Sequence, residues 1–199
     1  MNSQPTNDPL LQSMKEKIAE GDQNSFRLLF NMYSARLIRF ATTMVRSNEA
    51  AREVVDEVFI KIWRNKTSIT NIQNLTVYLY SATKNTALNY LSARAKENIT
   101  DSFDFFAVQI SDEQNPEKKL ITSELLKKIN TAIDQLPPRC KMVFKLIRED
   151  GLSYKEVGAI LNISPKTVDA QMVIAVKQIS EKVRAELEFF PRKNVKKLK

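Results

Sequence analysis

The chain has 199 residues, of which 31 are Lys or Arg, 23 are Asp or Glu and none is His. The lack of His removes the commonest general base and metal ligand, and the single cysteine, Cys140, excludes an internal disulfide and a thiolate metal cluster. Only three residues are Gly, which argues against Gly-rich phosphate loops and turn-rich β folds. The net charge of +8 indicates a polyanionic partner. We therefore expect no catalytic residue, no cofactor and no metal.

The basic excess is unevenly distributed along the chain. By segment, the net charge is −2 for residues 1–23, +6 for 24–94, −3 for 95–122, +2 for 123–188 and +5 for 189–199. The apolar runs are far shorter than the roughly 18 residues that cross a bilayer, and the first 14 residues lack the pattern of a secretory signal. We expect a soluble protein of the reducing cytoplasm.

Three amphipathic helices are predicted in the first half of the chain. Apolar residues at the spacing of one helical face mark the first of them: Phe26, Leu29, Phe30, Tyr33, Leu37, Phe40 and Met44. Residues 49–65 repeat this pattern, residues 75–91 do so less regularly, and the polar interval 65–74 between them is predicted to be a loop. Because three such helices can bury their apolar faces against one another, residues 24–94 are predicted to form one helical domain.

The composition of the chain changes after residue 94. Residues 95–122 lose helical periodicity and gain acidic residues, which predicts an acidic linker. Three phenylalanines in this linker (Phe103, Phe105 and Phe106) suggest that part of it docks onto something. Helical spacing resumes at Ser123, and Pro137-Pro138 ends one helix and starts the next, because proline fits a first helical turn and not an interior.

Residues 151–179 carry the most informative pattern. Ser153 and Glu156 have the spacing of a capping box, which predicts that a short helix begins there. Gly158 lies inside this helix at a cost of about 1 kcal/mol relative to Ala, and the expected reason is a close crossing by a neighbouring helix. Asn162 tolerates a left-handed turn, and Ser164 followed by Pro165 is typical of the start of a second helix.

Together these signals predict a helix-turn-helix, whose second helix would enter the major groove of DNA. Six residues lie toward its leading end: Lys166, Thr167, Asp169, Ala170, Gln171 and Val173. A plain helical hairpin without DNA-binding function has the same pattern, and the basic charge of the chain favours the DNA-binding interpretation.

Three segments also resemble a known family. LPPRCKMVFKLIREDGLSYKEVGAILNISPKTVDAQM (136–172) resembles region four of the extracytoplasmic-function (ECF) sigma factors of bacterial RNA polymerase, and most of all the large group found in Bacteroidetes. VVDEVFIKIW (54–63) resembles the polymerase-docking helix of region two in that family. VYLYSATKNTALNYL (77–91) resembles its minus-ten-binding helix.

The resemblance implies an all-α protein of two small helical domains that is not an enzyme. The implied organisation is an N-terminal extension (1–23), region two (24–94), an acidic linker (95–122), region four (123–188) and a basic tail (189–199). Such a protein would bind the beta-prime and beta subunits of core RNA polymerase, recognise double- and single-stranded promoter DNA and promote duplex opening. It would be restrained by a membrane-bound anti-sigma factor and would take no small-molecule substrate.

The resemblance also implies three groups of site residues. For polymerase docking they are Glu53, Asp56 and Glu57. For the minus-ten element they are Lys84, Asn85, Asn89, Arg94 and Tyr80, with Tyr78 and Tyr90 as further stacking partners and the 65–74 loop as the base pocket. For the minus-thirty-five element they are Ser164, Lys166, Thr167, Asp169, Gln171 and Lys177. For both groups a purely structural explanation is the alternative. Glu53, Asp56 and Glu57 could simply face solvent, and the tyrosines could be core residues.

This sequence departs from the family pattern at several of these positions. Tyr78, Asn89 and Ser92 stand where Trp, Asp and Arg are frequent, and Ala170 and Ile174 replace a polar and a basic residue in the second helix. Two other functions stay open on the residues alone. One is a transcription regulator with a similar helix-turn-helix, and the other is a protein-interaction bundle with a nonspecific basic surface. An enzyme is the weakest option, because no nucleophile–base set stands out.

Overall fold

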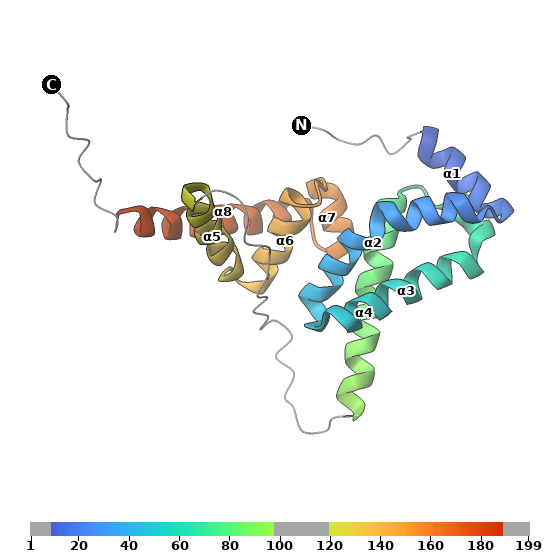
Figure 1. Cartoon of the computed structure of the whole chain (residues 1–199), viewed down its shortest axis with the longest axis horizontal. Coiled ribbons are helices and arrows are strands. Elements are labelled where there is room, and N and C mark those ends of the chain that lie inside the picture. The colour runs from blue at the N-terminus through green and yellow to red at the C-terminus, as the bar shows by residue number, and fades with distance from the viewer. Residues whose placement is uncertain (1–8, 98–119, 189–199) are drawn as a thin grey trace.

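The computed structural model describes residues 9–97 and 120–188, and the regular structure within these ranges is entirely helical (Figure 1). This confirms the predicted all-α class with two helical domains. The N-terminal domain is residues 9–97, and the C-terminal domain is residues 120–188. Residues 1–8, most of the predicted acidic linker (98–119) and the predicted basic tail (189–199) lie outside the described residues.

The N-terminal domain consists of α1 (Pro9–Glu20), α2 (Gln23–Val45), α3 (Asn48–Arg64), the 3-10 helix η1 (Lys66–Asn71) and α4 (Leu75–Glu97). Three side chains define where its long helices begin. The Asp22 carboxylate accepts hydrogen bonds from the amides of Asn24 and Ser25, and the Ser47 hydroxyl accepts from the amide of Ala50. The Asn74 amide oxygen accepts from the amide of Val77 at 2.9 Å. Each cap satisfies an amide that the helix itself leaves free.

The core of this domain contains the residues that the sequence places on one face of each helix. Leu29 and Leu37 of α2, Val55 of α3 and Leu79 of α4 are fully buried. Aromatic rings join α2 to α3, with the Phe26 and Trp63 centroids 4.8 Å apart and those of Phe30 and Phe59 4.9 Å apart. Such contacts add to the free energy of burying apolar surface.

The interval between α3 and α4 is more ordered than the predicted loop. It contains η1, and α1, which falls in the predicted N-terminal extension, packs against it and against α2. Ile18 of α1 and Ile69 of η1 are both buried. The interval looks like a loop in the sequence because isolated apolar residues among polar ones do not show that another helix covers them.

The C-terminal domain consists of α5 (Leu120–Asp134), α6 (Pro138–Arg148), α7 (Tyr154–Leu161) and α8 (Pro165–Glu188). Pro137 and Pro138 begin α6 as predicted. Gly151 follows the end of α6 with φ +72° and lets the Leu152 amide reach the Leu146 carbonyl at 3.0 Å. This turn directs the chain from α6 into α7.

Gly158 is crowded, but the crowding atom does not come from a neighbouring helix as the sequence suggested. A Cβ atom at this position would lie 2.8 Å from the Ile163 carbonyl oxygen, in the turn that follows α7. The Ile163 amide in turn donates to the Gly158 carbonyl at 2.9 Å. The glycine therefore allows the turn to fold back onto its own helix.

We predict that Gly158→Ala destabilises the protein, although this change ordinarily stabilises a helix by about 1 kcal/mol. The added methyl group meets a backbone carbonyl that cannot rotate away, so we expect a loss of about 1–3 kcal/mol. Urea unfolding of the full chain, followed by far-ultraviolet circular dichroism, measures the change. The control is Ala159→Gly at the exposed neighbouring position, where only the ordinary helix propensity is lost. A Gly158→Ala protein more stable than its parent would contradict this reading of the turn.

Candidate nucleic-acid interface

Helices α7 and α8 and the turn between them form the predicted helix-turn-helix. The Ser153 hydroxyl accepts from the Glu156 amide, and the Glu156 carboxylate accepts from the Ser153 amide at 2.9 Å, which completes the capping box. Asn162 adopts the left-handed conformation (φ 56°, ψ 47°). The Ser164 hydroxyl accepts from the Thr167 amide at 3.0 Å and caps α8. All these local signals were predicted from the sequence, and the structure confirms them.

The leading end of α8 is open to solvent. Met172 and Ala175 follow Val168 by four and seven residues, so all three side chains lie on one face of α8 and pack into the core. The opposite face of the helix is not needed for packing. Ser164, Lys166, Thr167 and Asp169 are exposed there. A helix N-terminus with free amides and a polar exposed face is the arrangement by which this motif reads DNA.

Two other residues predicted to read DNA are partly engaged within the protein. Gln171 is half-buried, and its side-chain oxygen accepts from the Cys140 thiol at 2.9 Å. Burial raises the pKa of that thiol, so Cys140 is a packing residue and not a thiolate nucleophile. Lys177 is exposed further along α8 and lies 3.9 Å from the Glu181 carboxylate.

The five predicted minus-ten residues lie on different sides of α4. Asn85 and Asn89 are exposed one turn apart, and Tyr78, two turns before Asn85, shares their face and is 43% exposed. Arg94 is exposed near the end of the helix, with its guanidinium 3.5 Å from the Tyr90 hydroxyl. The structure thus brings Asn85 and Asn89 together with Tyr78.

Tyr80 and Lys84 lie on another side of α4, toward the C-terminal domain. Tyr80 is buried, and its ring packs against Phe40 with centroids 5.2 Å apart. The Lys84 ammonium donates to the Ile160 carbonyl of α7 at 2.6 Å. In this conformation neither side chain is available to a DNA strand.

The three predicted polymerase-docking residues share one exposed face of α3. Glu53, Asp56 and Glu57 are separated by three and four residues, and all are open to solvent. Glu57 forms an ion pair with Lys61 one turn later. The opposite face of α3 carries the buried valines and Phe59, so the acidic face is not needed for packing.

A buried lysine, which no sequence pattern indicates, joins α1 to the predicted base-pocket interval. Lys15 is 6% exposed, and its ammonium donates to the Ile72 carbonyl at 2.8 Å and to the Gln12 side chain at 2.9 Å. Nothing in the sequence indicates that this lysine, whose neighbours in the helix are exposed, is itself buried. Here it holds the segment between η1 and α4 in place.

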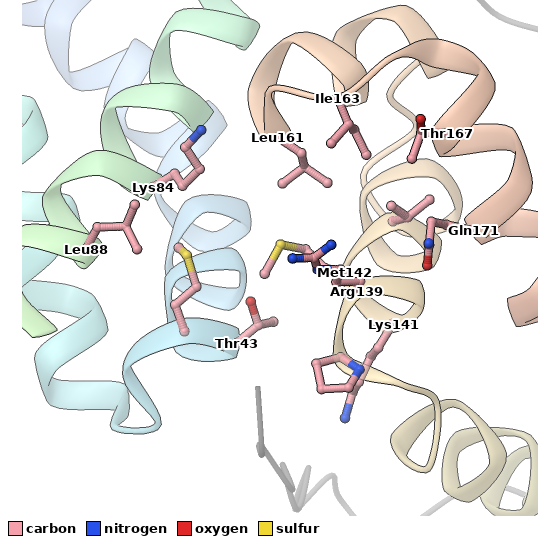
Figure 2. Close-up of a pocket in the computed structure, with 13 residues that line it drawn as sticks. Thr43, Lys84, Leu88, Arg139, Lys141, Met142, Leu161, Ile163, Thr167 and Gln171 are labelled. Atoms are coloured by element: carbon pink, nitrogen blue, oxygen red, sulfur yellow. The ribbon is translucent and has the colours of Figure 1, made fainter. Parts of the chain in front are cut away.

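A cavity with a volume of about 330 Å³ lies between the two domains (Figure 2). Lys84 and Leu88 of α4 form part of one wall, and Met142, Leu161 and Ile163 form part of the other. Within residues 9–97 and 120–188, no cluster of His, Cys, Asp or Glu could hold a metal ion. None of the helices in these ranges is both long enough and apolar enough to cross a bilayer.

Two helical domains, one of which carries an exposed recognition helix, define a DNA-binding protein of the helix-turn-helix class. Comparison with known families extends this. The model of sigma-70 region 2 matches residues 29–97, and the model of sigma-70 region 4 matches residues 126–179. The chain therefore belongs to the sigma-70 family, as a sigma factor of the ECF type, and sigma factors are not enzymes. This confirms the family predicted from the three motifs.

Individual relatives agree with this assignment. The chain is 29% identical over 180 residues to the ECF RNA polymerase sigma-E factor of Escherichia coli (strain K12), which covers 87% of this chain and 94% of that protein. It is also 29% identical over 181 residues to the sigma-E factor of Haemophilus influenzae, covering 87% and 95%.

Two solved structures have a similar fold. One is CnrH in complex with the cytosolic domain of CnrY, with TM-score 0.57, 17% identity, and 88% of this chain and 97% of that chain covered. The other is the sigma factor RpoE in complex with the anti-sigma factor NepR from Bartonella quintana, with TM-score 0.60, 20% identity and coverage of 81% and 98%.

We predict that Lys15→Met destabilises the protein by about 1–3 kcal/mol, because the Ile72 carbonyl loses its buried donor. We also expect faster amide hydrogen exchange in residues 66–74 than in the parent protein. Hydrogen exchange with mass spectrometry and urea unfolding measure the two effects. Lys17→Met, at an exposed position of the same helix, is the matched control and should leave both unchanged. Equal behaviour of the two variants would show that Lys15 does not hold this segment.

Proposed function

We propose that this sigma factor binds the beta-prime and beta subunits of core RNA polymerase, directs the enzyme to a promoter and promotes duplex opening. The observation that carries the proposal is that one chain combines an exposed recognition helix with a separate, exposed amide-bearing face on α4. The first suits double-stranded DNA, and the second suits a single strand. A regulator that only binds an operator has no need of the second face.

Polymerase docking is assigned to Glu53, Asp56 and Glu57. This assignment is supported by the position of the three carboxylates, which share one exposed face of a helix whose other face is buried. Their charges are therefore available to pair with basic groups of a partner. Complementary charge at such a surface speeds association and fixes orientation.

The minus-ten strand is assigned to Lys84, Asn85, Asn89, Arg94 and Tyr80, with Tyr78 on the same face as Asn85 and Asn89. Asn side chains offer both a donor and an acceptor to a base edge, and an exposed ring such as Tyr78 offers a stacking surface worth about 1–3 kcal/mol per base. The interval 65–74, held by Lys15, is the proposed pocket for an unstacked base.

The minus-thirty-five element is assigned to the leading end of α8. Ser164 and the first amides of the helix suit a phosphate, whereas Lys166, Thr167 and Asp169 are exposed and available to base edges. Gln171 is assigned to a base edge as well, and to reach it the side chain would release the Cys140 thiol. Lys177 lies about three turns further along and is placed for a backbone contact.

Several finer assignments belong to the same proposal. The domain limits are 24–94 for region 2 and 123–188 for region 4, with the extension, linker and tail as given above. The protein acts in the cytoplasm, where its polymerase is, and its lineage is that of the Bacteroidetes group. Restraint by an anti-sigma factor is supported by RpoE, a protein of similar fold whose complex with an anti-sigma factor has been solved, and we propose that the factor acting on this chain is membrane-bound.

Reconstituted transcription with core polymerase tests the proposal, on a promoter mapped from the transcripts that start when the protein is overproduced. We predict that Asn85→Ala slows open-complex formation about three- to tenfold, the equivalent of one lost hydrogen bond, and leaves the affinity for core polymerase within about twofold. Asn31→Ala, exposed on α2, is the control. If the unchanged protein does not alter core-only transcription, the proposed function fails. If Asn85→Ala weakens core binding as much as opening, the assignment of Asn85 to the strand fails.

We predict that Lys166→Ala weakens protection of the upstream promoter element and lowers the salt dependence of binding, because one cationic contact is lost. Footprinting at several salt concentrations measures both effects. Lys182→Ala is the matched control, because Lys182 lies on the same helix about 24 Å further along and bonds to Gln135. Unchanged protection with Lys166→Ala would mean that α8 enters the groove in an orientation that does not bring Lys166 onto the DNA.

A further inference from the structure

Several exposed side chains of α8 are apolar. Val173, Ile174 and Val176 are 60%, 41% and 42% exposed, and Ala170 is also open to solvent. All four lie between residues 170 and 176 of one helix. A single exposed apolar side chain is ordinary on a protein surface, whereas a cluster of them marks a surface that binds something.

Three of these side chains lie on the outward side of α8. The buried side chains of Val168 and Met172 define the side that faces the core. Successive helix residues point about 100° apart, so Ala170 points almost directly away from that side. Val173 and Ile174 follow it by three and four residues and lie on either side of it, one turn later. We call Ala170, Val173 and Ile174 the apolar strip.

The apolar strip is not covered by the part of the chain that the structure describes. Helix α8 contacts α5, α6 and α7, and it does so through its core side, where Ala175 and Ile179 belong to an apolar cluster with Leu136. Thr167 and Gln171, on a third side of α8, line the interdomain cavity (Figure 2). The strip thus remains exposed on the helix that carries the proposed DNA-reading residues.

Lysines stand at both ends of the apolar strip. Lys166 lies one turn before Ala170, and Lys177 lies one turn after Val173, about 16 Å from Lys166 along the helix axis. Lys177 is 3.9 Å from Glu181, and both side chains are well exposed, so this ion pair is weak. Cations at both ends suit a groove edged by phosphates. A second copy of the strip is disfavoured, because it would bring lysines together whether the two helices ran parallel or antiparallel.

The chemistry of the strip selects among the bases of the major groove. Alanine, valine and isoleucine side chains have no hydrogen-bond donor or acceptor. Guanine, cytosine and adenine present donors and acceptors there, and thymine adds a methyl group at C5. Packing an aliphatic side chain on a polar base edge leaves that edge without a partner and is unfavourable. Packing it on the thymine methyl group buries apolar surface and is favourable.

The geometry of the strip sets the spacing of the bases. From Ala170 to Val173 and Ile174 the helix rises about 5–6 Å, which corresponds to one to two base-pair steps of about 3.4 Å. We propose, on the basis of the proposed function, that the minus-thirty-five element of this protein contains two thymines, adjacent or one base pair apart, whose methyl groups pack against the apolar strip.

Replacement of thymine by uracil tests the proposal, because it removes only the methyl group and keeps every hydrogen-bonding group of the base. Each thymine of the mapped upstream element is replaced in turn, and the affinity of the polymerase holoenzyme for the promoter is measured by competition at fixed salt. We expect two neighbouring positions at which uracil weakens binding about fourfold each, the loss expected for one buried methyl group. Uracil at the other positions should change the affinity by less than about twofold.

A protein variant then assigns the methyl contacts to the strip. Val173→Ala shortens the side chain and raises the helix propensity, so folding is retained. We expect it to lose the sensitivity to uracil at one of the two positions, where the fourfold effect should fall below about twofold. Val176→Ala is the matched control, because Val176 is also exposed but is turned back toward the core side of α8. It should keep the full effect at both positions.

The outcomes separate this inference from the proposed function. If the parent holoenzyme transcribes but no uracil weakens binding by more than about twofold, the thymine contacts are overturned and the proposed function stands. If uracil weakens the Val173→Ala holoenzyme as much as the parent, the assignment to the strip is overturned. A dimer of the free protein that Val173→Ala abolishes, measured by sedimentation, would show that the strip binds a second copy instead. Absence of transcription from the parent would overturn both the proposed function and this inference.

Discussion

The arrangement of the two domains depends on a helix that is too short to be stable alone. Helix α7 has eight residues, and isolated helices shorter than about 12–15 residues are marginal in water. Its stability comes from the capping box at Ser153 and Glu156 and from burial of one face against both α8 and α4. The Glu156 carboxylate serves both purposes, because one oxygen closes the cap and the other bonds to Asn74. Local helix formation and domain docking are therefore coupled through a single side chain.

The features that the sequence predicts correctly are the ones with short-range causes. The capping box, the left-handed Asn162, the Ser164 cap and the proline at the start of α8 each involve residues within four positions of one another. The periodic apolar faces of α2 and α3 likewise indicate which side is buried. In each case the interacting residues are close together in the sequence, so a short sequence pattern is enough to predict the interaction.

The interdomain contacts have no such signal. Arg39 and Asp150 are 111 positions apart, Asn74 and Glu156 are 82, and Lys84 and Ile160 are 76. Lys84 donates to a backbone carbonyl, and because every residue type has one, the sequence does not show where this contact lies. The predicted minus-ten residues show the same limit, because the irregular pattern of α4 does not reveal which of them face solvent. Asn85 does, whereas Tyr80 is buried.

The irregular pattern of α4 itself has a physical cause. One side of the helix packs against α2 and α3, another packs against α7, and a strip containing Tyr78, Asn85 and Asn89 stays exposed. Successive residues point about 100° apart, so Lys84 meets α7 while Asn85 faces solvent. The α4 side chains that contact the C-terminal domain and those that face solvent are thus neighbours in sequence but different residues. The Arg39–Asp150 pair, which joins the two domains, likewise involves none of the residues in the exposed strip.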